Sequence, residues 1–212
     1  MFEEILVEKL VDESNSWDRV RQENEIPAKM LAFCWRRYDS TRPEELFQNT
    51  RVILGTLLHR GLERYFGYED KSVNVLKKKV GDYVIVGMPD LILGDTVYEF
   101  KYSTRSPKEP REWDIRQVRT YLWITGKPRG EIVYFTPWKI DSFEVTEPAT
   151  DEEILEWIEH KWAKYEWECN NCPFKDECEH SLIKANNDPK QSTIPDSTDI
   201  EIKKIGGDEN ER

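Results

Sequence analysis

Asp90, Glu99 and Lys101 bring two carboxylates and an amine close together in the sequence. Carboxylate oxygens are hard ligands of the kind that Mg²⁺ and Mn²⁺ prefer. A lysine beside such a cation can orient or deprotonate a water molecule, or offset the negative charge that develops on a phosphate oxygen. The three residue types therefore predict hydrolysis of a phosphodiester, provided that the fold holds them on one face.

A β-hairpin is the element that would position these side chains. Residues 91–93 and 96–102 are rich in branched and aromatic side chains, and Gly94-Asp95 between them is a signal for a two-residue turn. With these two residues in the turn, the register places Asp90 directly opposite Glu99. The pattern thus predicts a pair of carboxylates that face one another across the hairpin.

The pair Asp90 and Glu99 needs a counter-charge. Residues opposed across an antiparallel ladder lie roughly 4.5–5.5 Å apart at Cβ, where like charges repel and destabilise the hairpin. A divalent cation between them removes this repulsion. Side chains alternate along a strand, so Lys101 points to the same face as Glu99. The alternative is a solvent-exposed hairpin edge, on which Asp, Glu and Lys are common.

The most regular helical pattern of the chain covers residues 48–66, where apolar residues recur at helical spacing. Gly55 and His59 are four residues apart and therefore share a face of this helix. His59 could add a nitrogen ligand to the site. The alternative is an ordinary helix histidine whose ring is satisfied by hydrogen bonds.

A second predicted helix follows the hairpin, at residues 111–124. Gln117 and Tyr121 are four residues apart on it and share a face. They could hold a phosphate or Lys101, although a glutamine and a tyrosine on a helix are commonplace.

The distribution of charge along the chain indicates whether the protein could bind a nucleic acid. The chain has a net charge of −11, whereas nucleic-acid binding is usually accompanied by a basic balance. Between Lys101 and Arg129, however, eight residues are basic and three are acidic. This segment predicts a track for DNA, with a solvated helix face as the alternative. The arginines that we expect to contact DNA are Arg105, Arg111, Arg116 and Arg119.

Four cysteines are the second group of residues that could carry chemistry. Cys169, Cys172 and Cys178 follow a C-x2-C-x5-C spacing, and Cys34 lies far upstream. Four thiolates suit an iron–sulfur cluster or tetrahedral zinc, and two disulfides are the remaining alternative. The arrangement of one distant and three clustered thiols differs from paired zinc knuckles and favours a 4Fe-4S cluster. Such a cluster would tie the N-terminal and C-terminal segments together in a structural role.

The order of elements predicts an α/β fold with a central mixed sheet flanked by helices. Strands are expected at 73–80, 83–88, 91–93, 96–102, 131–136 and 139–145, and helices at 26–38, 48–66, 111–124 and 150–165, besides an element of uncertain type at 1–13. The last helix begins with a capping box of Thr150 and Glu153. We expect one domain at residues 1–185, which includes the cysteine module. Residues 186–212 form an acidic polar tail that is expected to be mostly disordered.

The sequence also predicts a cytoplasmic location. No apolar run approaches the roughly 18–20 residues that span a membrane, and the acidic start Met1-Phe2-Glu3-Glu4 is unlike a signal peptide. Disulfides are rare in the cytoplasm, which weakens the disulfide interpretation of the cysteines.

Taken together, these motifs resemble a known family. His59, Gly87-Met88-Pro89-Asp90, Glu99-Phe100-Lys101 and Gln117-x3-Tyr121 look like the motifs of RecB-type nucleases in the PD-(D/E)xK superfamily, whose core is restriction-endonuclease-like. With the cysteine set added, the chain resembles the fourth CRISPR-associated (Cas) protein family, over about residues 34–178. In one departure, Trp35 follows the first cysteine, where the family often has proline.

The resemblance implies a role for each residue. His59, Asp90 and Glu99 would bind Mg²⁺ or Mn²⁺ together with the carbonyl of Phe100. Lys101 would be the catalytic lysine, supported by Gln117 and Tyr121. Cys34, Cys169, Cys172 and Cys178 would hold a 4Fe-4S cluster.

The implied activity is a DNA exonuclease that cuts single-stranded DNA, commonly from the 5′ end, and processes it for capture as CRISPR spacers. The implied partners are DNA, the CRISPR integrase complex and further copies of the chain. Two alternatives share the same residues. One is an AddB-like recombination or repair nuclease, and the other is a DNA-end binding scaffold that cuts nothing.

Overall fold

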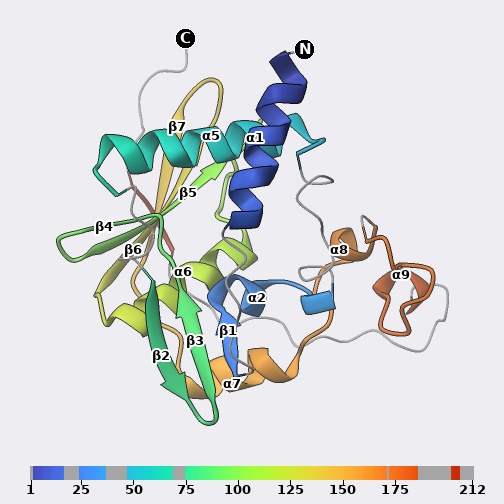
Figure 1. The fold of residues 1–212 in the computed structure, drawn as a ribbon. Helices are drawn as coiled ribbons and strands as arrows, with labels where there is room; N and C mark the ends of the chain where they lie inside the picture. The colour runs from blue at the N-terminus through green and yellow to red at the C-terminus, as the bar shows by residue number, and fades with distance from the viewer. Residues whose placement is uncertain are drawn as a thin grey trace.

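The computed structural model describes residues 2–16, 24–36, 47–68, 75–170, 172–185 and 202–205. These residues form two mixed β-sheets with helices packed around them (Figure 1). The helices are α1 (Phe2–Ser16), α2 (Ala28–Ala32), α5 (Thr50–Tyr65), α6 (Glu112–Thr125), α7 (Asp151–Glu159), α8 (Glu166–Asn170) and α9 (Leu182–Ala185).

The smaller sheet has the strand order β1-β3-β2, with β1 (Glu25–Pro27), β2 (Leu76–Val80) and β3 (Tyr83–Gly87). β1 runs parallel to β3, and β2 runs antiparallel to it. The predicted turn at Gly81 and Asp82 is present, and Gly81 has φ 54°, a left-handed conformation that favours glycine.

The larger sheet has the strand order β4-β5-β6-β7-β8, with β4 (Leu91–Leu93), β5 (Thr96–Tyr102), β6 (Arg129–Phe135), β7 (Ile140–Val145) and β8 (Lys203–Ile205). β5 and β6 are parallel and are joined through α6, whereas the other pairs are antiparallel. The predicted mixed sheet with flanking helices is therefore present.

The two faces of β5 bury different side chains. Val97 belongs to the main core, which also contains Val118 and Leu122 of α6. Phe100 belongs to a smaller cluster that includes Leu62 of α5. Alternation along the strand thus directs Val97, and with it Glu99 and Lys101, toward α6, and Phe100 toward α5. The region around β5 is consequently lined by helices on both sides.

Two predicted helices differ from the structure. Residues 26–38 were expected to be one helix, but Glu25–Pro27 form β1 and only Ala28–Ala32 form α2; residues 37–38 lie outside the described part of the chain. Pro27 is the N-cap of α2, with extended backbone (φ −60°, ψ 134°). The last predicted helix begins with the expected capping box but ends at Glu159 instead of Tyr165.

A short part of the tail is described in the structure. Lys203–Ile205 form β8, which pairs with β7 from Ser142↔Ile205 to Glu144↔Lys203. Apart from Ile202, the rest of the tail is outside the described residues, so the prediction that the tail is mostly disordered stays a prediction. The start of the strand predicted at 73–80 also falls outside them, and β2 begins at Leu76.

Within the described segments, no helix has both the length and the apolar character that crossing a membrane requires.

Candidate functional site

The predicted hairpin register is present in the structure. Leu91 pairs with Tyr98 and Leu93 pairs with Thr96, with Gly94 and Asp95 in the turn. Asp90 lies just before this ladder, in a bend that connects the two sheets. Asp90 and Glu99 are therefore opposite one another, as expected. They lie one step beyond Leu91 and Tyr98, the last paired residues of the ladder.

Asp90 is fixed from two sides. Its Oδ2 accepts a hydrogen bond from the backbone N–H of Phe100, at 2.7 Å. Its Oδ1 lies 3.0 Å from Nδ1 of His59 on α5. One turn before His59, a Cβ added at Gly55 would stand 3.7 Å from Cβ of Tyr102 on β5, so α5 and β5 are in close contact there. A side chain as small as alanine would also fit there, so the closeness of α5 to β5, rather than glycine itself, brings His59 to Asp90.

Lys101 connects the groups on the α6 side of the site. Its Nζ donates to Oε1 of Glu99 at 2.6 Å and to Oε1 of Gln117 at 3.0 Å. It also lies 3.4 Å from Oδ1 of Asp114 on α6. The ammonium is thus held by two carboxylates and one amide, and its position is defined by the protein itself.

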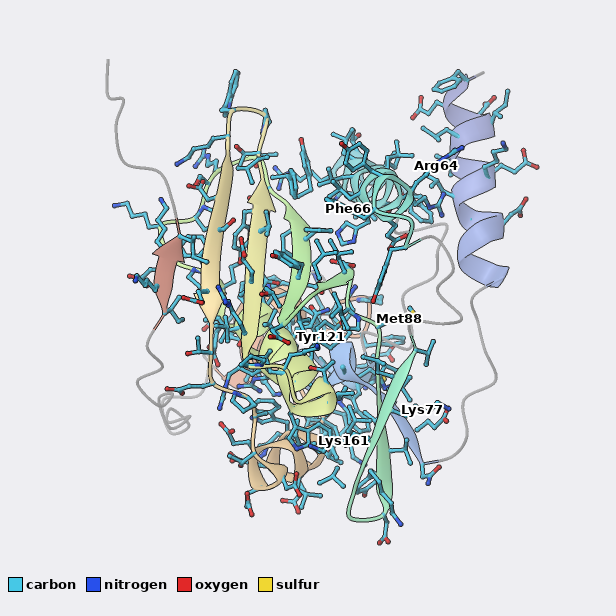
Figure 2. All side chains as sticks on the ribbon, turned by 90° about the vertical axis from the view of Figure 1, so that its left-hand side faces the viewer. Arg64, Phe66, Lys77, Met88, Tyr121 and Lys161 are labelled. Carbon is cyan, nitrogen blue, oxygen red and sulfur yellow. The ribbon has the colours of Figure 1, made fainter. Side chains whose placement is uncertain are left out.

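Gln117 and Tyr121 are linked to one another and to the loop before Asp90. Nε2 of Gln117 donates to the hydroxyl of Tyr121 at 2.8 Å, and this hydroxyl donates to the carbonyl of Met88 at 3.3 Å. Figure 2 shows Tyr121 beside Met88. Gly87 makes this contact possible, because a Cβ there would stand 3.2 Å from the Tyr121 ring and 2.7 Å from Ile124. The two helix residues therefore connect Lys101 to the segment that carries Asp90.

Burial and neighbouring charges shift the pKa values of Glu99, Asp90 and Lys101 in the site. Burial and the neighbouring charge of Asp90 raise the pKa of Glu99 to about 7. Burial opposes ionisation of Asp90, but the attraction and hydrogen bond of His59 hold its pKa below its ordinary value. Burial disfavours the charge on Lys101 as well, yet Glu99 and Asp114 raise the pKa of its ammonium. The centre thus holds one firmly charged cation beside a carboxyl group that titrates near neutral pH.

The donor set fits a divalent cation. Glu99 is 3% exposed, and its Oε2 has no hydrogen-bond partner within the described part of the chain. An unsatisfied buried carboxylate oxygen is costly unless a cation or water supplies the missing interaction. In addition, one ligand atom from each of His59, Glu63 and Asp90 lies within 4.8 Å of the other two. Oxygen and imidazole donors of this kind suit Mn²⁺ or Mg²⁺.

Three residues of the site were missed from the sequence. Asp114 is 2% exposed and accepts a hydrogen bond of 2.6 Å from Tyr134 of β6, so it is held behind Lys101. Glu63 follows His59 by one helical turn, a spacing that could have indicated it. Lys29 of α2 carries no sequence signal, because only the fold brings α2 to the site.

Lys29 is a second cation that faces the centre. The residue is exposed to solvent overall, but protein atoms crowd around its ammonium. This loss of water and the neighbouring Lys101 lower the pKa of Lys29, whereas the carboxylates of Glu99, Asp90 and Asp114 oppose that shift. Lys29 therefore lies within electrostatic reach of the charged groups on the α6 side of the site.

The arginines predicted to contact DNA have different roles. Arg119 is 7% exposed and forms paired hydrogen bonds of 2.8 Å with both carboxylate oxygens of Glu153. It is committed to joining α6 to α7, which argues against its prediction as a DNA contact. Arg116 pairs with Glu112 and covers the ring of Trp157. Arg105 and Arg111 are exposed and remain predictions as DNA contacts.

The cysteine region is tied together by a buried carboxylate. None of the four cysteines is in a disulfide, so the structure gives no support to the disulfide alternative. Glu168, 1% exposed, accepts from the backbone N–H of Cys34 at 2.7 Å and of Lys164 at 3.0 Å. It therefore joins the segment of Cys34 to the segment that carries Cys169.

Further contacts reinforce this junction. The N–H of Trp35 donates to the carbonyl of Lys161 at 3.0 Å, and Nζ of Lys164 donates to the carbonyl of Leu31 at 2.7 Å. The guanidinium of Arg36 lies 4.5 Å from the centre of the Phe174 ring, and Phe174 lies between Cys172 and Cys178 in the sequence. Cys34, Cys169 and Cys178 are each buried, as expected of thiols that hold a metal or pack inside the protein. The segment of Cys34 therefore lies against the segment of Cys169–Cys178, and the cluster predicted to join them stays a prediction.

Comparison with known proteins decides the family. The chain is 30% identical over 203 residues to the CRISPR-associated exonuclease Cas4 of Saccharolobus solfataricus, and the match covers 86% of this chain and 100% of that protein. The chain belongs to the CRISPR-associated exonuclease Cas4 family. This confirms the resemblance drawn from the motifs, although no family model matches the sequence.

One solved structure agrees with this assignment at the level of the fold. The crystal structure of SSO0001 matches with a TM-score of 0.71 and 28% identity, covering 86% of this chain and 98% of that one. The alkaline exonuclease LHK-Exo of Laribacter hongkongensis matches at a TM-score of 0.37 and 14% identity, with 65% of this chain and 88% of that chain covered, too weakly to support an argument. The Cas4 member thus has the predicted mixed α/β nuclease fold.

Proposed function

We propose that the chain is a metal-dependent deoxyribonuclease that shortens single-stranded DNA from its 5′ end during CRISPR adaptation. The observation that carries the proposal is Nζ of Lys101, held at 2.6 Å from Glu99 beside the Asp90–His59 pair. The name of its Saccharolobus relative, a CRISPR-associated exonuclease, supports the activity and its setting.

Hydrolysis requires water to add to phosphorus while the bond from phosphorus to the leaving deoxyribose oxygen breaks and that oxygen gains a proton. His59, Asp90, Glu99 and the carbonyl of Phe100 would hold a Mg²⁺ or Mn²⁺ ion, which supplies Lewis acidity toward the phosphate and lowers the pKa of water. Lys101 offsets negative charge on a phosphate oxygen. Asp114 and Gln117 hold its ammonium in place, so little reorganisation is needed when DNA arrives.

Replacement of Glu99 by Gln tests the proposal. Gln keeps the volume and an oxygen that accepts from Lys101, but it removes the carboxylate charge. We expect cleavage of 5′-labelled and 3′-labelled single strands in Mn²⁺ to fall about 10²- to 10³-fold, in the range that loss of one electrostatic catalytic group causes. Exposed Glu159→Gln is the matched control and is expected to cut at the wild-type rate.

The comparison of the two labels reports the direction of cutting. Release of short labelled products from the 5′ label before the 3′ label is expected. Full activity of purified Glu99→Gln, or DNA binding by the wild type without any metal-dependent product, contradicts the proposed nuclease. The second result is the one expected of a DNA-end binding scaffold.

We also propose that Cys34, Cys169, Cys172 and Cys178 hold a 4Fe-4S cluster that stabilises the domain. Support comes from the burial of three of the thiols and from the Glu168 junction between their segments. Protein purified without oxygen should be brown, with broad absorbance near ~400 nm from thiolate-to-iron charge transfer. A colourless preparation that contains zinc contradicts this assignment.

The proposed partners follow from the family. The products of cleavage would pass to the CRISPR integrase complex, and copies of the chain would associate with one another. Light scattering of the cluster-loaded protein measures this association, and a mass equal to that of one chain contradicts it.

A further inference from the structure

Glu63 is the one buried acid of α5, and it faces the site. It is 6% exposed, although most of the helix around it is partly or fully open to solvent. Its spacing of four residues from His59 places both side chains on the same face. That face packs toward β5, where Leu62 contacts the small cluster of Leu91 and Phe100. Glu63 is therefore directed toward the end of the hairpin that carries Asp90.

The distances within this group are those of a ligand set. One donor atom of Glu63 lies within 4.8 Å of a donor atom of both His59 and Asp90. Atoms that each bind one ion at about 2.0–2.2 Å stand no more than roughly 4.4 Å apart, so small adjustments are enough to close the group around a cation. Two carboxylates and an imidazole offer the donors that Mn²⁺ accepts.

A second observation points to a cation at the same place. Oε2 of Glu99 is buried without a hydrogen-bond partner among the described residues, although Oε1 of the same group accepts from Lys101. Asp90 is the common neighbour, since it interacts electrostatically with Glu99 and directly with His59. Asp90 is thus the shared neighbour of Glu63 from α5 and of Glu99 from β5, while Lys101 contacts Glu99 from the α6 side.

We propose that Glu63 coordinates the divalent cation of this site together with His59 and Asp90. The inference rests on the proposed metal-dependent function, and it adds a ligand on the α5 side to the set predicted from the sequence. Through Glu63, the helix and the hairpin are held together by the ion as well as by apolar packing.

Binding of Mn²⁺ to the full-length, cluster-loaded protein tests the proposal without DNA. Free Mn²⁺ is followed by its electron paramagnetic resonance signal during titration of the wild type, Glu63→Gln, Asp90→Asn and the surface control Glu159→Gln. Loss of a group that merely supports a ligand costs about 10- to 100-fold in metal affinity, so loss of a ligand should cost at least about 10-fold. We expect this loss in Glu63→Gln and wild-type affinity in Glu159→Gln.

The outcomes separate the two proposals. Wild-type Mn²⁺ affinity in Glu63→Gln overturns the role of Glu63, and the nuclease proposal stands if Asp90→Asn has lost affinity. Absence of Mn²⁺ binding in the wild type itself overturns the metal centre as a whole. Should Glu63→Gln lack a cooperative thermal transition, the anomalous map of a wild-type crystal soaked in Mn²⁺ decides: an ion touching the Glu63 carboxylate supports the proposal, and an ion held only by Asp90 and Glu99 overturns it.

Discussion

The nuclease centre and the cysteine region are organised in opposite ways. In the nuclease centre the functional side chains bind one another directly, as Lys101 does with Glu99 and Gln117. In the cysteine region the backbone around the thiols makes the contacts, and Glu168 binds the N–H groups of Cys34 and Lys164. The first region thus fixes its side chains through one another, whereas the second fixes the chain through backbone groups.

The largest change is expected from Glu168→Ala. Its carboxylate accepts from the N–H groups of Cys34, Lys164 and Tyr165. The bond from Cys34 is buried, and those from Lys164 and Tyr165 are partly buried. A buried donor left without an acceptor costs about 1–3 kcal/mol, so the free energy of unfolding should fall by about this amount or more. Urea unfolding measures this loss.

Glu168→Gln is the matched variant, because it retains one acceptor oxygen and should lose less stability than Ala. Mn²⁺ affinity at the nuclease centre should be unchanged in folded Glu168→Gln. Equal stability of Glu168→Ala and the wild type would contradict the role of this carboxylate as the tie between the two ends of the domain.

A change of pH is expected to have an intermediate effect on the free energy of unfolding. The effect has one sign for Glu99 in the nuclease centre and the opposite sign for Lys164 in the cysteine region. Glu99 has its pKa raised from 4.5 to about 7 by burial and Asp90. The folded protein therefore keeps a proton that the unfolded chain has lost, and stability contributed by this group falls as pH rises from about 4.5 to 7. Lys164 has its pKa lowered from 10.5 to about 7 by burial and Arg116, so its contribution rises between about pH 7 and 10.5.

Thermal melts of metal-free protein across these windows measure both effects. Glu99→Gln should flatten the acid-side decline only, and Lys164→Met should flatten the alkaline-side rise only. A Glu99→Gln protein whose melting temperature keeps the wild-type slope from about pH 4.5 to 7 would show that another group causes the decline.

The smallest effect is expected from Lys29→Gln. Lys29 lies within electrostatic reach of the carboxylates and Lys101, and we predict that it binds a DNA phosphate without touching the reacting atoms. Binding of single-stranded DNA in EDTA should weaken a few-fold, and the slope of log affinity against log salt should become shallower by about 0.7 if one phosphate is no longer neutralised. Lys79→Gln on exposed β2 is the control, and an equal effect of both variants would indicate only a general charge effect.

Local signals were enough to predict much of the fold. The hairpin of β4 and β5 has its turn at Gly94-Asp95 as expected, and the capping box of Thr150 and Glu153 begins α7. The helix α5 follows from its apolar spacing. Because these elements gave the relative positions of Asp90, Glu99 and Lys101, the centre of the site was also predictable.

The errors lie where distant contacts replace local preference. β1 has three residues and depends on parallel pairing with β3, so residues 26–27 could not be separated from the helix that follows. α7 stops at Glu159 because the next backbone groups bind elsewhere: the carbonyl of Lys161 accepts from Trp35, and the N–H of Lys164 donates to Glu168. No periodicity in the sequence carries this information.

Residues of the site were missed for the same reason, because their roles depend on contacts between distant parts of the chain. Asp114 and Arg119 both lie on α6, five residues apart, and their positions in the sequence do not show which of the two charges belongs to the site. The structure places Asp114 behind Lys101 and Arg119 against Glu153. Which charge serves the site and which serves packing is decided by the neighbouring elements, β5 for one and α7 for the other.

The short strand β8 gives the sheet a protected border. Without a neighbour, β7 would present a row of open backbone groups to which a strand of another molecule can add. β8 occupies these groups, and it places Lys203 and Lys204 along the new outer rim, with Lys204 anchored to Asp141 at 3.2 Å. Positive charges on a rim discourage further strand addition, so three residues near the C-terminus protect the molecule against aggregation through this side of the sheet.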